Sequence, residues 1–303
     1  MKRRPFLAAA GTGIVGAIAG CAGSSSSGAN STEAAGTEAT ETATSTSTES
    51  SGNKTLFEHT GTLETSFVAN GDYPTDENPA DGYPPEFPDP PAAPDVDESS
   101  FDTIGANGEA VTLVPIDVAE KWFYRAEARF VDARGIPQYE RAHIYGSVLS
   151  TAQRHSDGGG IDGWAKDDRV VTYCGCPHHL SSLRAAGLQK AGYTNVYAID
   201  EGFGEWSARG NPMAGTSFGS DEQSDVKEWV LKGKVGASFA GEYVWVEAAR
   251  QYEAAPIQAD GSFSVTLKFS GVSAETLVSV ATPAFETTAP LGELASGTIT
   301  GSE

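Results

Sequence analysis

Two cysteines and two histidines stand within six consecutive residues of this chain, in the segment Cys174-Gly175-Cys176-Pro177-His178-His179. The thiolate form of cysteine is both a nucleophile and a metal ligand, and it is favoured beside cationic histidine or a helix N-terminus. Imidazole and thiolate together also bind soft or borderline metal ions. The segment therefore predicts either a nucleophilic cysteine or a metal site.

A strand before this segment and a helix after it position the cysteine. Val170, Val171 and Tyr173 form a short apolar run of β-branched and aromatic residues, which predicts a buried strand. Ser181 and Ser182 are favourable N-cap residues, and the apolar residues after them have helical spacing up to a stop at Gly192. Backbone amides of the loop and of the helix N-terminus then face Cys174 and stabilise a negative sulfur. We expect the loop to comprise Gly175, Cys176, Pro177, His178, His179, Leu180 and Ser181.

Strands and helical segments alternate on both sides of this loop. The folded core is expected to begin near Glu109, with a helix over 115–124 and a strand over 128–134. A further strand over 195–199 leads to a short helix after Glu201. Such alternation predicts an α/β fold with a parallel sheet and helices on both faces.

The order of motifs along this core resembles the rhodanese family of sulfurtransferases over about residues 109–215. The resemblance is carried by Val131-Asp132-Ala133-Arg134, His143-Ile144-Tyr145-Gly146-Ser147, Tyr173-Cys174, Ala185-Ala186, Gly202-Phe203, Trp206 and Pro212. It implies that Cys174 carries a persulfide cradled by loop amides. It also implies that Asp132, Arg134 and His143 mainly hold the domain together.

The resemblance implies a two-step sulfur transfer without a cofactor. The Cys174 thiolate takes sulfur from a small donor, and a thiol-type acceptor then removes it. The loop is two residues longer than the common rhodanese pattern and lacks Arg and Lys, and Glu201 replaces the first Gly of a Gly-Gly-Phe turn. We therefore expect an anionic donor to be disfavoured. Related phosphatases and arsenate reductases need an arginine that closes the loop, whereas Arg184 lies well inside the helix.

Two other interpretations use the same loop. Cys174, Cys176, His178 and His179 are all plausible ligands, which predicts a metal-binding module as the main alternative. A redox- or sulfur-sensing module, with Cys176 as the resolving thiol, is a third interpretation.

The N-terminus predicts export and a lipid anchor. Arg3 and Arg4 precede an apolar stretch over 6–19 that is too short for a transmembrane span of ~20 residues, so residues 1–21 read as a signal peptide. Ile18-Ala19-Gly20-Cys21 resembles a lipobox, and the start resembles a twin-arginine signal. Cys21 would then carry lipid on the outer face of the cell membrane. An uncleaved N-terminal anchor is the alternative.

The net charge of the chain indicates the salt content of its surroundings and the class of partner. The net charge is −21, with 41 Asp and Glu against 20 Lys and Arg. Such an excess is tolerable where salt screens self-repulsion, as in proteins of halophilic archaea, which this composition resembles. It also argues against a nucleic-acid partner, whose phosphates would be repelled.

The remaining segments differ in composition from the core. Residues 22–55 are rich in Ser, Thr, Gly, Ala and Glu, which predicts a flexible tether. Residues 56–108 mix aromatic residues with proline and form either an extended arm that lies on the next domain or a disordered spacer. After a linker over 216–225, residues 226–303 show period-two alternation and turn signals, which predict a small all-β sandwich.

Overall fold

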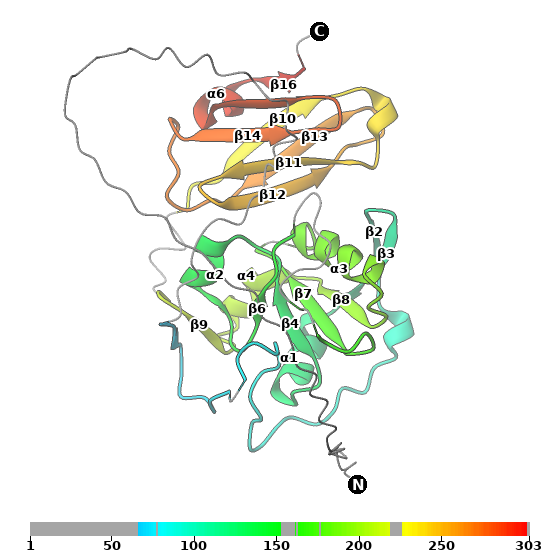
Figure 1. Ribbon diagram of the computed structural model, residues 1–303, viewed down its shortest axis with the longest axis vertical. Helices are drawn as coiled ribbons and strands as arrows, with labels where there is room; N and C mark the ends of the chain where they lie inside the picture. Colours follow the sequence, from blue (N-terminus) through cyan, green and yellow to red (C-terminus); the bar gives the residue numbers. More distant parts are fainter. Residues whose placement is uncertain are drawn as a thin grey trace, which may run out of the picture. The chain divides into compact units, whose positions relative to one another are not determined.

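The structure is a computed structural model, and it describes residues 66–76, 78–152, 161, 163–175, 177–218 and 226–301 (Figure 1). All of these residues belong to one compact unit that spans Asn53–Glu303. The helices are α1 (Ile116–Tyr124), α2 (Ile136–Arg141), α3 (Leu180–Lys190), α4 (Gly202–Ala208) and α6 (Leu291–Ser296).

A largely parallel sheet forms the centre of the first part of this unit. Its strands are β2 (Thr103–Ala106), β3 (Glu109–Val114), β4 (Arg129–Asp132), β6 (Val148–Leu149), β7 (Val170–Tyr173) and β8 (Val196–Ile199), in the order β2-β3-β8-β7-β4-β6. Only the β2–β3 pair among them is antiparallel. The sheet therefore begins at β2, before the expected start near Glu109.

Helices cover both faces of this sheet because the strand side chains alternate between two cores. Val170 packs with Leu183 and Leu188 of α3, whereas the next residue, Val171, packs with Phe123 of α1 and Trp206 of α4. A strand with apolar residues on both faces is typical of a parallel sheet between helices. The predicted α/β class is confirmed.

The proline-rich segment before the sheet lies along this α/β core. Strand β1 (Val68–Ala69) pairs with β9 (Met213–Gly215), which also pairs with β5 (His143–Ile144). Phe87 contacts Phe123 and Tyr124, with ring centroids 5.7 and 5.0 Å apart. Of the two forms that the composition left open, residues 66–76 and 78–102 adopt the extended arm, and their aromatic rings supply its contacts.

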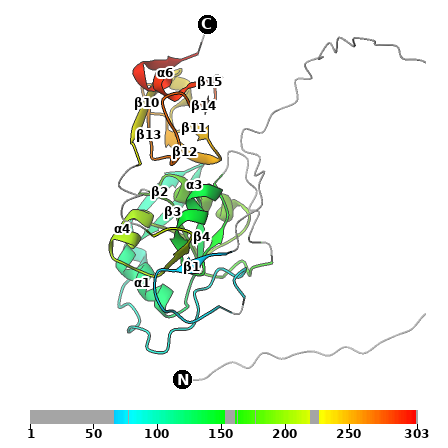
Figure 2. The ribbon, with the colours of Figure 1, turned by 90° about the vertical axis from the view of Figure 1, so that its left-hand side faces the viewer.

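The C-terminal part consists of two small sheets that share one core. The strands are β10 (Trp229–Lys234), β11 (Tyr243–Ala248), β12 (Gln251–Pro256), β13 (Ser262–Leu267), β14 (Leu277–Ala281), β15 (Glu286–Pro290) and β16 (Thr298–Thr300). One sheet has the order β13-β10-β16 and the other β12-β11-β14-β15 (Figure 2). Leu231 and Val265 of the first pack with Val244 and Val280 of the second. This is the expected β-sandwich arrangement.

The β11–β12 hairpin reaches the α/β core beside the cysteine loop. Its turn residues, Ala249 and Arg250, have φ values of 48° and 61°. A Cβ atom on Gly135, which begins α2, would meet the backbone of Arg250 and Gln251. Tyr252 of β12 belongs to the same buried cluster as Cys174. The sandwich therefore packs against the element that carries the cysteine.

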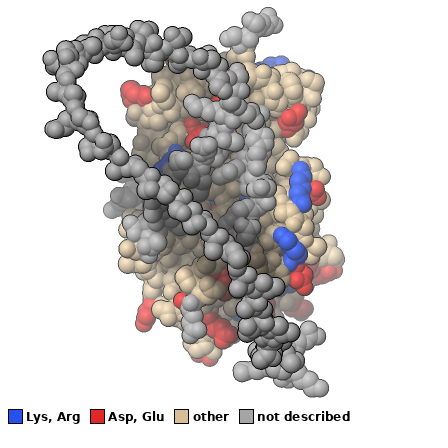
Figure 3. Space-filling model, viewed as in Figure 1, with Lys and Arg blue, Asp and Glu red and all other residues tan. Residues whose placement is uncertain are grey.

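Acidic side chains are scattered over the face shown in Figure 3, and basic side chains are few there. This pattern agrees with the net charge of −21.

Candidate active site

Cys174 follows strand β7 directly and is buried, with 1% of its surface exposed. Its carbonyl oxygen accepts a hydrogen bond of 2.8 Å from the backbone N–H of Phe203 at the start of α4. Its Sγ atom lies 3.4 Å from the Oγ atom of Ser181, in the first turn of α3. The sulfur therefore lies at the N-terminus of an 11-residue helix, where the helix dipole favours negative charge.

Helix α3 begins at Leu180, two residues before the start that an N-cap at Ser181 would give, and its N-cap is His179. The prediction that Ser181 or Ser182 is the N-cap is wrong, because both hydroxyls have other partners. Ser182 Oγ donates to the carbonyl oxygens of His178 and His179, the latter at 3.0 Å. Ser181 Oγ contacts the sulfur of Cys174. The two serines thus lie in the first turn of α3 and contact residues of the loop before it.

The two histidines of the loop contact different carboxylates. His178 has a positive φ of 41°, and its Nε2 atom lies 2.9 Å from Asp200 Oδ1. The Nδ1 atom of His179 lies 3.6 Å from Oε1 of Glu253 in β12. Within the described part of the chain, no group of three or more His, Cys, Asp or Glu side chains is arranged to hold a metal ion.

His179 brings a titratable group to the cysteine loop, where its charge interacts with that of Cys174. Hydrogen bonding of its ring to the Glu253 carboxylate raises the pKa of His179, burial lowers it, and the charges of Glu253 and Cys174 raise it further, so the net direction is upward. A raised pKa keeps the imidazolium form populated to higher pH than for an ordinary histidine. A positive charge beside a thiol favours the thiolate.

A buried ion pair brings a second cation to the loop. Arg134 Nη2 lies 2.6 Å from Asp132 Oδ2, and its guanidinium stacks 4.1 Å over the ring of Phe203. A Cβ atom on Gly175 would lie 3.8 Å from Arg134 Cδ, so the arginine passes beside the loop. Burial lowers the pKa of Arg134, but the charge and hydrogen bonds of Asp132, with Tyr173 and Cys174, raise it overall. The guanidinium is therefore permanently charged.

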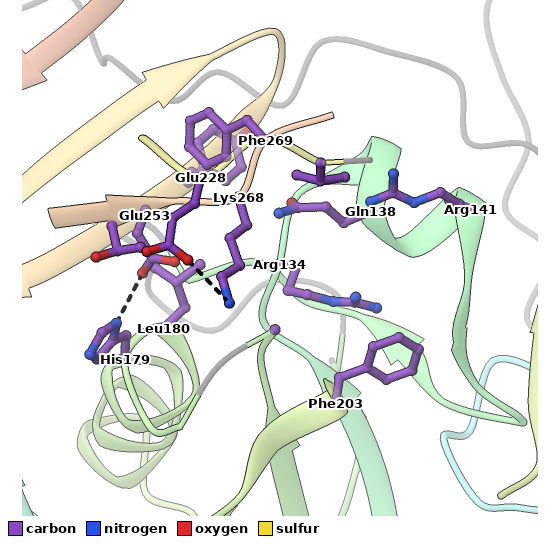
Figure 4. Close-up of a pocket in the computed structure, with 14 residues that line it drawn as sticks. Arg134, Gln138, Arg141, His179, Leu180, Phe203, Glu228, Glu253, Lys268 and Phe269 are labelled. Carbon is purple, nitrogen blue, oxygen red and sulfur yellow. Dashed lines mark ion pairs between the residues drawn. The ribbon is translucent and has the colours of Figure 1, made fainter. Parts of the chain in front are cut away.

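A cavity of about 500 Å³ opens in front of the loop (Figure 4). Gly175, Leu180 and Phe203 line it from the α/β core. The sandwich supplies the opposite wall, where the charged residues are Glu228, Glu253 and Lys268. The volume falls within the range of small-molecule sites in proteins.

The comparison with protein families decides the class of the α/β core. The model of the rhodanese-like domain matches residues 116–209. These residues form a rhodanese-like domain. The solution NMR structure of the rhodanese-like domain of the Alr3790 protein from Anabaena sp. is 19% identical, with a TM-score of 0.32, and the match covers 34% of this chain and 79% of that one. The BH2092 protein from Bacillus halodurans is 17% identical, with a TM-score of 0.29, and its match covers 37% and 88%. A search of curated proteins gave no match.

Two residues that were expected to support the site, His143 and Glu201, make structural contacts, and so does Arg184, which was expected to lie inside the helix. His143 is 3% exposed, and its Nδ1–H donates to the Tyr139 carbonyl oxygen at 2.7 Å. Glu201 accepts a hydrogen bond of 2.9 Å from the N–H of Ile116, so its carboxylate caps α1. Arg184 is 1% exposed, and its Nη2 atom donates to Ser150 Oγ at 2.6 Å. These bonds turn the Glu201 carboxylate toward α1 and the Arg184 guanidinium into the core.

Sequence reasoning missed the residues that the sandwich contributes beside the rhodanese-like domain. Tyr252, Glu253 and Lys268 line the cavity, although no motif near them indicates a site. The only local signal was the absence of Arg and Lys from the loop, because a cation at an anionic sulfur must then come from elsewhere. Arg134 was assigned to structure, and it has both roles: it pairs with Asp132 and it lines the cavity.

Several predictions concern residues outside the described ranges. They are the lipid site Cys21, the signal peptide over 1–21, the tether over 22–55 and the second thiol, Cys176. Among the described helices, none is both long enough and apolar enough to span a bilayer.

Proposed function

We propose that this protein is a sulfurtransferase that carries sulfane sulfur as a persulfide on Cys174 and passes it to a thiol acceptor. One observation carries the proposal: Cys174 follows the central strand of a rhodanese-like domain, with its Sγ atom at the N-terminus of α3. Rhodanese-like domains include sulfurtransferases and inactive members, so the proposal depends on the chemistry around this sulfur.

In the first step, the Cys174 thiolate attacks the outer sulfur of a donor persulfide, R–S–S–H. A new S–S bond forms at Cys174, the S–S bond of the donor breaks, and R–S⁻ leaves with the electron pair. The outer hydrogen stays on the transferred sulfur until it ionises, and the leaving thiolate takes a proton from water. No net oxidation occurs, because the transferred sulfur keeps its oxidation state.

In the second step, an acceptor thiolate attacks the outer sulfur of the Cys174 persulfide. The S–S bond at Cys174 breaks, the Cys174 thiolate leaves with the electron pair, and the acceptor now carries the persulfide. The same thiolate is thus both the attacking group and the leaving group, and whatever stabilises it assists both steps.

Three features of the chain support an anionic sulfur at this position. The N-terminus of α3 faces the sulfur, Glu253 raises the pKa of His179, and Arg134 is permanently charged beside Gly175. Arg134 is buried, and a buried charge acts more strongly than one in water. Each of the three features is already in position before a donor binds.

Access to the sulfur depends on the loop. Because Cys174 is 1% exposed and the cavity reaches the adjacent Gly175, a donor in the cavity approaches the sulfur past Gly175.

The test is sulfur transfer from glutathione persulfide to cyanide in high salt, measured as thiocyanate above the uncatalysed background. We expect Cys174→Ser to fall to background and Cys176→Ser to keep turnover within about threefold of the parent protein. Turnover that survives Cys174→Ser would contradict the proposal. A stoichiometric metal ion retained by the parent protein and lost in His179→Ala would support the metal-binding alternative and also contradict it.

The proposal includes export and anchoring by lipid on Cys21. It is supported by the paired arginines, the short apolar stretch and the lipobox-like residues before Cys21. Mass spectrometry of the membrane fraction tests it, and we expect a mature protein that begins at a lipid-modified Cys21. The Cys21→Ala variant should be released from the membrane. An unmodified N-terminus in the membrane fraction contradicts it.

A further inference from the structure

The loop around Cys174 contains no Lys or Arg, yet a lysine from the C-terminal sandwich faces it. Lys268 follows strand β13 and lines the same cavity as Gly175 and Leu180. Figure 4 shows its side chain extending into the cavity, toward α3 and the loop. A loop without Lys or Arg thus has a lysine from a different part of the chain in its cavity.

Lys268 differs from the other cations of the cavity in how firmly it is held. Arg134 is fixed by a buried carboxylate at 2.6 Å. Lys268 has Glu228 as an ion-pair partner at 3.7 Å, and the two side chains are 63% and 55% exposed. Exposed ion pairs of this length contribute little and exchange partners readily. An anionic ligand can therefore replace Glu228 at the ammonium group.

The charges of the cavity differ from those of the whole protein. Acidic residues outnumber Lys and Arg by 41 to 20 in the sequence, so most of the surface repels anions. The cavity of about 500 Å³ is lined by Arg134, Arg141 and Lys268 and by two carboxylates, Glu228 and Glu253. The acidic excess of the sequence is thus absent from this cavity, and a small anion is repelled less there than elsewhere.

We propose that Lys268 is a specificity-determining residue of the persulfide site and binds the anionic head group of a small sulfane-sulfur carrier. This inference rests on the proposed function. A carrier whose sulfur approaches the loop at Gly175 extends its other end across the cavity toward the sandwich wall. The head group is a carboxylate or a sulfonate, since both offer oxygen acceptors to the ammonium.

The inference reverses the expectation that an anionic donor is disfavoured. That expectation rested on the composition of the loop and on Glu201. The carboxylate of Glu201 bonds to the N–H of Ile116, and the cations come from Arg134 and Lys268 instead.

The experiment compares alkyl persulfides that differ only in head group: 2-carboxyethyl, 2-sulfoethyl, 2-hydroxyethyl and 2-aminoethyl. The rate of persulfide formation on the full-length protein is followed by the mass gain of one sulfur atom. Because one exposed ion pair changes a rate by about fivefold, we expect the parent protein to prefer an anionic head group over the hydroxyl by about that factor. Lys268→Gln should remove this preference and Lys268→Arg should keep it.

Two further variants sharpen the comparison. Glu228→Gln frees the ammonium from its partner, so the preference for anionic head groups should rise. Lys234→Gln, an exposed lysine on β10 of the same sandwich, should leave it unchanged. The preference should also shrink with added salt, because the Debye length falls from about 10 Å at 0.1 M to about 3 Å at 1 M.

The outcomes separate this inference from the proposed function. A preference for either anionic head group that Lys268→Gln removes supports the inference, and the two anionic donors show which head group is better bound. An equal preference in the parent protein and in a folded Lys268→Gln overturns the inference and leaves the proposed function standing. If no donor places sulfur on Cys174, the proposed function itself fails.

Discussion

The Nδ1 atom of His179 lies 3.6 Å from the Oε1 atom of Glu253. His179 caps helix α3 of the rhodanese-like domain, whereas Glu253 belongs to strand β12 of the sandwich. A carboxylate far along the chain thus contacts the imidazole at the end of the cysteine loop. The contact joins the cysteine loop to the sandwich.

Replacing Glu253 by Gln should lower the pKa of His179. The hydrogen bond and charge of Glu253 raise this pKa, whereas burial alone would lower it. We expect the NMR titration of the His179 ring to move to lower pH. Loss of the cation should slow persulfide formation on Cys174 by about threefold to tenfold near neutral pH.

The same variant should change stability with a defined sign. A raised pKa in the folded state stabilises the protein below the pKa of the unfolded state, and this contribution disappears as pH rises through the folded pKa. Glu253→Gln should therefore destabilise the protein more at pH 6 than at pH 9. Glu286→Gln, at an exposed position in β15, is the control and should show no such trend. If Glu253→Gln lost the same amount of stability at both pH values, the ion pair between His179 and Glu253 would not contribute to stability.

His143 should make the protein sensitive to acid. Burial of the ring in the core lowers the pKa of His143 from 6.5 to about 4, and the hydrogen bond that the ring donates to the Tyr139 carbonyl oxygen offsets this only in part. The unfolded state takes up this proton first, so stability falls as pH drops from about 6.5 to about 4, by about 3 kcal/mol in all.

Urea unfolding across this pH range checks the contribution of His143. His143→Asn keeps a donor for the Tyr139 carbonyl and does not titrate, so its stability should depend less steeply on pH between 6.5 and 4. An unchanged slope would assign the acid sensitivity to other groups.

Asp132→Asn should destabilise the rhodanese-like domain strongly. Asp132 is fully buried and accepts hydrogen bonds from the backbone and guanidinium of Arg134. Leaving a buried guanidinium without its counter-charge costs about 3–5 kcal/mol. Chemical denaturation measures this loss. The double variant Asp132→Asn/Arg134→Met should recover part of it, and a single variant as stable as the parent would show that Arg134 finds another partner.

Gly135→Ala should make Cys174 easier to alkylate. A Cβ atom at this position would meet the carbonyl oxygen of Arg250 and the Cα atom of Gln251, so the β11–β12 turn must move away. Tyr252 of that hairpin packs in the same cluster as Cys174. In a Cys176→Ser background, we expect iodoacetamide to label Cys174 about fivefold or more faster.

Gly297→Ala serves as the control for this variant, because no atom lies within 4 Å of the added Cβ atom. Iodoacetamide should label Cys174 in this variant at the same rate as in the parent protein. Unchanged labelling in Gly135→Ala would mean that the hairpin does not limit access to the sulfur.

The elements around the cysteine were predictable because their patterns are local. The all-apolar run Val170–Val171 with Tyr173 predicted the buried strand, and the helical spacing of Ile116, Ala119 and Phe123 predicted α1. Asp260-Gly261 is one of the turn signals within residues 226–303, and Gly261 has a φ of 83° there.

The residues that complete the site were not predictable for two physical reasons. Strand β12 follows a turn formed by Ala249 and Arg250, which adopt positive φ without the Gly or Asn that signals such a turn. The hairpin was therefore missed, and Glu253 with it. Lys268 reaches the cavity only because the sandwich packs on the cysteine loop. The sequence pattern of the strands does not predict this contact between distant segments.

The persulfide on Cys174 is tested most directly by locating the transferred sulfur. The parent protein is incubated with 2-carboxyethyl persulfide in high salt, alkylated to trap persulfides, and digested for tandem mass spectrometry. We predict one added sulfur on Cys174, also in Cys176→Ser, and its loss when an acceptor thiol is added. Added sulfur on Cys176 alone, or none on either cysteine of a folded protein, would contradict the account.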